Sequence, residues 1–195
     1  MPGQPLVWDA CDLLCLVASN RASEILVALG CPCFVVREVL AGETLWLRLL
    51  PEEAGQPSLI RGDLSDLLQD GLLHEITMTQ PEALLMVEYA EVLDDGEART
   101  AAAAFTRGWL VATSDRAAVR LLRSLEPPPP VLTAVDWVKQ WSEAVSADPG
   151  AVAEVIRRIE LRSRWRPPRA HPLAAWWGRS GYGGSARSTK SDGEL

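Results

Sequence analysis

Four acidic residues stand where a predicted strand ends or a predicted helix begins. They are Asp9, Glu38, Glu97 and Asp115. Carboxylate oxygens are the ligands that hard divalent cations such as Mg²⁺ prefer. Several carboxylates at one place repel each other, and a cation relieves that repulsion. The four acids therefore predict a shared metal site, at which a bound cation would activate water and stabilise charge on a phosphodiester.

Other kinds of catalytic site have little support. The only histidines, His74 and His171, stand in no serine- or cysteine-based nucleophile motif. Neither a glycine-rich dinucleotide motif nor a P-loop motif occurs. The cysteines are Cys11, Cys15, Cys31 and Cys33. Their spacing is not that of a zinc knuckle, so we expect buried free thiols, with a zinc or redox site as the alternative.

The elements that must position the acids alternate along the chain. Predicted strands cover residues 6–8, 33–36, 72–77, 109–112 and 131–132. Predicted helices cover residues 13–18, 20–29, 37–49, 59–68, 81–92, 97–107 and 115–125, with Asp12 as the expected N-cap of the first. This alternation predicts an α/β fold with a mainly parallel sheet. Such sheets bind ligands beyond the carboxyl ends of their strands.

That edge is where Asp9, Glu38 and Asp115 are expected, because each follows a strand. Glu97 begins a helix that precedes a strand, so this reasoning does not place it. Each acid alone also has a structural explanation. Asp9 suits a turn, Glu38 and Glu97 balance helix dipoles, and Asp115 suits an N-cap. Taken together, the four positions favour the metal site.

The chain changes character near residue 134. We expect a nuclease-like domain over 1–133, two helices packed on it within 134–177, and a disordered Gly- and Ser-rich tail over 178–195. Charge is uneven as well: residues 1–156 hold 23 acidic and 10 basic residues, whereas 157–195 hold 3 and 9. A basic end on an acidic body indicates a polyanion contact or docking on the body.

The segment 157–169, which includes Trp165, has two interpretations. It could bind phosphates and stack on bases, or its arginines could pair with acids while its tryptophans pack on the body. We favour packing because the body is so acidic. No apolar run reaches the roughly 20 residues of a membrane helix, and the N-terminus lacks a signal peptide. The expected location is therefore cytoplasmic, with no membrane partner.

Four segments in order resemble the PIN-domain family of Mg²⁺- or Mn²⁺-dependent ribonucleases, which includes the toxins of VapBC-type toxin–antitoxin pairs. They are Leu6-Val7-Trp8-Asp9-Ala10, Val35-Val36-Arg37-Glu38-Val39-Leu40, Asp95-Gly96-Glu97-Ala98 and Leu110-Val111-Ala112-Thr113-Ser114-Asp115-Arg116. The resemblance covers residues 6 to about 135. Two positions depart from the family pattern: Ser114 replaces an acid found in many relatives, and Glu97 stands where many toxins have aspartate.

The resemblance implies a Rossmann-like sheet of about five strands with helices on both faces, and acids converging at one pole. It makes Asp9, Glu38, Glu97 and Asp115 the catalytic residues and the ligands of Mg²⁺ or Mn²⁺. RNA would be the substrate, and a cognate antitoxin and a second copy of the chain are the expected partners. The alternative is a non-catalytic module with the same fold that binds protein or RNA. Whether all four acids converge distinguishes the two hypotheses.

Overall fold

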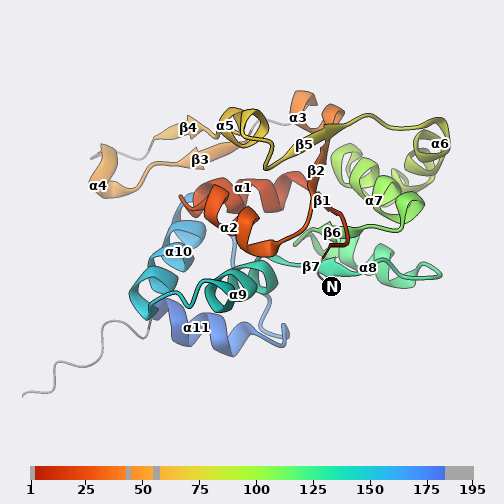
Figure 1. Ribbon diagram of the computed structural model, residues 1–195. Coiled ribbons are helices and arrows are strands. Elements are labelled where there is room, and N and C mark those ends of the chain that lie inside the picture. The colour runs from red at the N-terminus through yellow and green to blue at the C-terminus, as the bar shows by residue number, and fades with distance from the viewer. Residues whose placement is uncertain (1–2, 43–44, 55–57, 183–195) are drawn as a thin grey trace, which may run out of the picture.

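The computed structural model of the chain describes residues 3–42, 45–54 and 58–182. Its centre is a five-stranded parallel sheet in the order β5-β2-β1-β6-β7 (Figure 1). The strands are β1 (Leu6–Trp8), β2 (Cys33–Val36), β5 (His74–Ile76), β6 (Leu110–Ala112) and β7 (Val131–Leu132). The predicted α/β fold with a mainly parallel sheet of about five strands is confirmed.

The middle of the sheet is formed by β1 and β6, in which every residue is buried. Strands of parallel sheets are covered on both faces, which is why these short runs are wholly apolar. Leu6 lies opposite both Cys33 and Leu110, and Trp8 lies opposite Ala112. This register makes β1, β2 and β6 end at the same edge of the sheet, as their parallel order requires.

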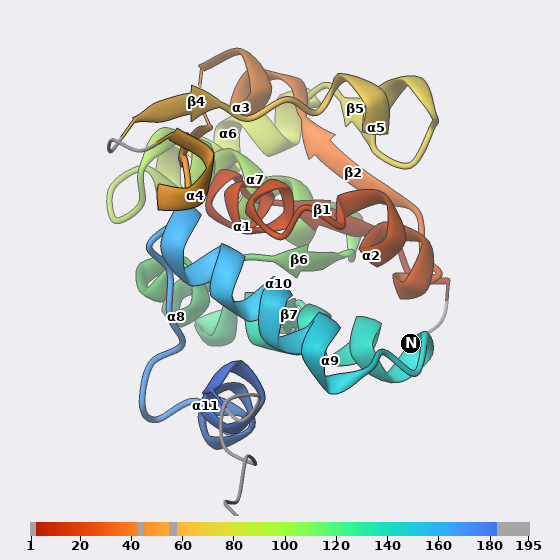
Figure 2. The same cartoon turned by 90° about the vertical axis from the view of Figure 1, so that its left-hand side faces the viewer.

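Helices cover both faces of the sheet. On one face, α7 (Asp95–Arg107) packs on β1, β2 and β6, with α3 (Arg37–Gly42), α6 (Gln80–Tyr89) and α8 (Arg116–Ser124) beside it. On the other face lie α1 (Ala10–Ala18), α2 (Ala22–Leu29), α9 (Ala134–Ala144) and α10 (Pro149–Arg162), which are in front of the sheet in Figure 2. The close approach of α7 depends on its buried alanines, Ala98 and 101–104.

Two predicted helices are wrong in their extent. The helix expected over 37–49 ends at Gly42, and β3 (Trp46–Arg48) pairs antiparallel with β4 (Leu59–Arg61) in a separate two-stranded sheet. The helix expected over 59–68 is replaced by β4 and the short α5 (Ser65–Gln69), and α4 (Pro51–Ala54) lies in the interval between the two predicted helices. Residues 43–44 and 55–57 lie outside the described part.

The reason is visible in β3, where only the middle residue, Leu47, is buried. Its position alternates with two exposed neighbours, which is the period of a strand with one covered face. Besides its partner strand β4, β3 contacts α1 and α10. Because α10 lies more than a hundred residues away, a short sequence window cannot distinguish this pattern from a helical one.

The C-terminal helices share the core of the sheet domain. Trp137 and Trp141 of α9 are fully buried, and Trp141 Nε1 donates to Glu24 Oε1 at 3.1 Å. A third helix, α11 (Ala174–Tyr182), follows the two that were predicted, so the expected disordered tail is wrong for 178–182. Residues 183–195 lie outside the described part.

The arginine- and tryptophan-containing segment packs on the body, as favoured above. Trp165 meets the ring of buried Trp177 edge-on, with centroids 5.4 Å apart. Arg157 pairs with Glu52, and Arg166 pairs with Glu160. Much of the positive charge of this segment is therefore matched by acids within the chain itself.

The four cysteines are free in the structure, with Cys15 and Cys33 buried and the other two partly buried. Over the ranges that the structure describes, no helix combines the length and apolarity needed to cross a membrane.

Candidate functional site

Asp9 is held rigidly at the carboxyl edge of the sheet. It follows β1 directly, has only 2% of its surface exposed, and caps α1 by accepting from the Ala10 backbone N–H at 2.8 Å. Its second oxygen accepts from Thr113 Oγ1 at 2.9 Å and from Cys11 Sγ at 3.1 Å. Burial raises the pKa of Asp9, and the nearby charge of Asp115 adds to this effect.

Asp115 lies at the same edge, three residues after the end of β6. It caps α8, because its Oδ1 accepts from the backbone N–H groups of Ala117 at 2.6 Å and Ala118 at 2.9 Å. Thr113 links the two acids: its hydroxyl donates to Asp9 and accepts from the Asp115 backbone N–H at 3.3 Å. No described residue donates to the second oxygen of Asp115, which leaves that oxygen available to a ligand.

Glu97 approaches these two acids from α7. It stands in the first turn of α7, is partly buried, and lines a narrow pocket together with Asp9 and Thr113. Burial raises the pKa of Glu97 to about 7, with further contributions from the charges of Asp115 and Asp9. The position that sequence reasoning could not place therefore faces the other two acids.

Glu38 does not join this group. It is exposed on α3, two residues after β2, and makes no hydrogen bond or ion pair with any described residue. Its neighbour Arg37 pairs with Glu75 at 3.1 Å. The structure thus brings Asp9, Glu97 and Asp115 together and leaves Glu38 outside them, although all four lie at or near the same edge.

Asp12 is an acid near the site that sequence reasoning misassigned. The expected N-cap role is wrong because Asp9 caps α1 and Asp12 lies within its first turn. Asp12 is fully buried, and its Oδ1 accepts from Trp137 Nε1 at 2.7 Å. Burial raises its pKa to about 7. The three-residue spacing from Asp9 could have placed Asp12 on the same side of the helix, but nothing local identifies Trp137.

The chemistry of the three converging acids suits a hard divalent cation, because carboxylates repel each other strongly when partly buried and a cation relieves that repulsion. Their present geometry is less suitable. Within the described ranges, no three His, Cys, Asp or Glu side chains are arranged to hold a metal ion. The pocket between Asp9 and Glu97 is also too narrow to admit water. Cation binding there requires the Glu97 or Asp115 side chain to move.

The geometry of the site is the main guide to its chemistry. Comparison of the chain with protein-family models, with curated proteins and with solved structures finds no match.

Proposed function

We propose that the chain is a metal-dependent ribonuclease that hydrolyses RNA phosphodiester bonds at the carboxyl edge of its sheet. The observation that supports this proposal is the convergence of Asp9, Glu97 and Asp115 from three separate elements. Ligand sites of parallel α/β sheets lie at this edge. The resemblance to PIN-domain ribonucleases assigns these three acids, together with Glu38, to the metal.

In the proposed site each acid has a distinct part. Asp9 is fixed by Ala10 and Thr113 and presents negative charge in one orientation. Asp115 keeps one oxygen on the end of α8 and offers the other to the ligand. Glu97 is held less firmly than Asp9, because it has a backbone hydrogen bond with Asp94 but receives none from a described side chain. Mg²⁺ or Mn²⁺, when bound, supplies an activated water and neutralises charge on the phosphodiester.

Glu38 has a different part in this proposal. From its exposed position on α3 it would orient water or substrate at the rim, rather than contact the cation together with the inner acids. If the chain belongs to the toxin branch, a cognate antitoxin and a second copy of the chain are its proposed partners.

A second candidate is a non-catalytic module with the same fold that binds protein or RNA. Two observations favour it: Glu38 stands apart from the other acids, and the pocket beside Asp9 does not admit water. In that case the buried acids would serve the fold, as Asp9 and Asp115 already do by capping two helices.

RNA cleavage in the presence of Mg²⁺ or Mn²⁺ distinguishes the two candidates. We expect the wild type to cleave and Asp9→Asn and Asp115→Asn to be inactive. Asparagine preserves the capping oxygen, so both variants should keep their fold, which circular dichroism and thermal melting check. Glu91→Gln is the matched control, because Glu91 is exposed and its carboxylate contacts no described polar group. Equal cleavage by all four proteins, or none by the wild type across varied RNAs, would contradict the proposal.

A further inference from the structure

A row of arginines runs along the outer side of α8. Arg116, Arg120 and Arg123 are all exposed, and none of them forms an ion pair with a described residue. Their spacing of four and three residues puts them within about 60° of one another around the helix and along about 10 Å of its axis. The chain therefore presents three uncompensated positive charges in one line.

This arrangement contrasts with that of several arginines elsewhere in the described chain. Arg107, Arg157 and Arg158 all pair with glutamates. Helix α8 itself contains no acidic residue, and like charges four residues apart destabilise a helix. Arg116 also lies in the first turn, where the helix dipole disfavours positive charge. The row thus costs local stability, and an anionic ligand would offset that cost.

An apolar hollow lies beside the row. It has a volume of about 300 Å³ and is lined by Val92, Ala117, Arg120, Leu121 and Ser124. Val92 belongs to the turn between α6 and α7 and is 64% exposed. The hollow therefore has an apolar floor and a guanidinium group at its rim. A flat ring attached to a phosphate fits this combination, with the ring on the floor and the phosphate beside the guanidinium group.

The same helix also borders the acidic pocket. Ala118 and Leu122 line the pocket that contains Asp9 and Glu97, whereas the preceding residues, Ala117 and Leu121, line the hollow. Successive helical residues are about 100° apart. Going around α8, the order is thus the arginine row, the hollow, and the side that borders the acids. A ligand in the hollow lies between the positive charges and the acidic site.

We propose that this surface of α8 binds single-stranded RNA, with the sugar–phosphate backbone along the arginine row and one unstacked base in the hollow. Arginine binds phosphate through several donors, and apolar or aromatic floors accept bases that are not paired. The rest of the acidic body repels a polyanion. A polyanion can therefore approach best where unpaired cations lie in a row, as on α8. The role of this surface in presenting substrate rests on the proposed ribonuclease function, whereas the binding itself does not.

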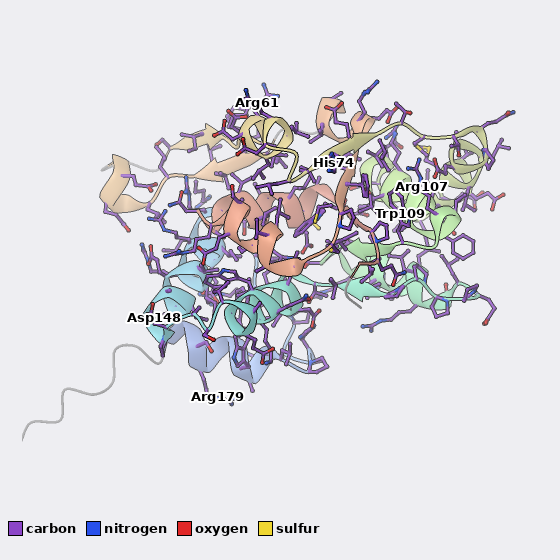
Figure 3. The ribbon with its side chains drawn as sticks, viewed as in Figure 1. Arg61, His74, Arg107, Trp109, Asp148 and Arg179 are labelled. Carbon is purple, nitrogen blue, oxygen red and sulfur yellow. The ribbon has the colours of Figure 1, made fainter. Side chains whose placement is uncertain are left out.

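Binding of a fluorescein-labelled single-stranded RNA, measured by anisotropy in EDTA, tests this inference without cleavage. Arg120→Ala/Arg123→Ala removes two charges away from the acids. Arg61→Ala/Arg179→Ala is the matched control: it removes two exposed arginines that lie at the top and bottom of the view in Figure 3, away from α8 at the right of Figure 1. Thermal melting of both variants verifies their fold.

Each phosphate contact with single-stranded nucleic acid contributes about 0.7 to the slope of log affinity against log salt. The α8 variant should therefore lower that slope by about 1.4, so that the advantage of the wild type shrinks about sevenfold between about 50 and 200 mM salt. The control should keep the slope of the wild type, and Arg120→Lys/Arg123→Lys should retain most of it because lysine still pairs with phosphate.

Several outcomes would overturn the inference: no binding by the wild type, an unchanged slope in the α8 variant, an equal loss in the control, or preference for duplex RNA or anionic vesicles over the single strand. The proposed function is judged separately by cleavage with metal. If the wild type fails to cleave but the α8 variant loses salt-dependent binding, the ribonuclease proposal falls and the binding surface stands.

Discussion

Glu97→Gln is the substitution for which the structure predicts the clearest effect. Burial and the charges of Asp115 and Asp9 raise the pKa of Glu97 from its usual 4.5 to about 7. A carboxyl group with a raised pKa favours the fold while it is protonated. This contribution is fully present below about pH 4.5 and is lost as the pH rises through about 7. Glutamine resembles the neutral form, so the variant should lack the part of the pH-dependent loss of stability that comes from Glu97.

The size of the effect follows from the same pKa difference. A carboxyl group that titrates at about 7 when folded and near 4.5 when unfolded loses about 2.5 kcal/mol of folding free energy between about pH 5 and pH 8. Because Glu97 is only partly buried, solvent screening reduces this to about 1–2 kcal/mol. Asp9 and Asp12 also have raised pKa values. The quantity to compare is therefore the change in the free energy of unfolding with pH for the wild type minus the same change for the variant.

Urea unfolding at both pH values measures this difference. Between about pH 5 and pH 8, the free energy of unfolding of the wild type should fall by about 1–2 kcal/mol more than that of Glu97→Gln. Glu91→Gln, which removes an exposed carboxyl group, should follow the wild type. Millimolar Mg²⁺ at pH 8 should restore stability to the wild type and much less to Glu97→Gln, because a cation relieves the repulsion that the amide lacks. Identical pH dependence in wild type and Glu97→Gln would refute the reasoning.

Two further predictions concern buried polar groups. Arg107→Ala leaves Glu82, which is 1% exposed, without its cation and should lower the free energy of unfolding by about 3 kcal/mol or more. As a control, Arg37→Ala breaks an exposed ion pair and should lower the free energy of unfolding by less than about 1 kcal/mol. Equal losses of the two variants in urea unfolding would contradict this distinction between buried and exposed pairs. Trp137→Phe removes the N–H that donates to fully buried Asp12 and should cost about 1–3 kcal/mol. That loss should be smaller at about pH 5, where Asp12 is protonated, and a loss independent of pH would argue against this role.

Local patterns in the sequence were sufficient for much of the fold. The apolar runs before Asp9 and Asp115 are central strands of a parallel sheet, and the residue after such a strand lies at its carboxyl edge whatever the rest of the chain does. The helix predicted over 97–107 is α7, which lies close on the sheet through its buried alanines. The same local reasoning was wrong for 37–49, because whether Leu47 belongs to a helix or a strand depends on its contacts with distant elements.

The sequence by itself determined the sheet, its edge, and two of the three converging acids, because strand period and chain direction are local properties. Only the tertiary structure decided that Glu97 faces Asp9 and Asp115, that Glu38 stands apart, and that Trp137 pairs with Asp12. These relations depend on how helices cross the sheet and on contacts between residues far apart in the chain. The two-residue repeat of strands and the 3.6-residue repeat of helices carry no information about such contacts.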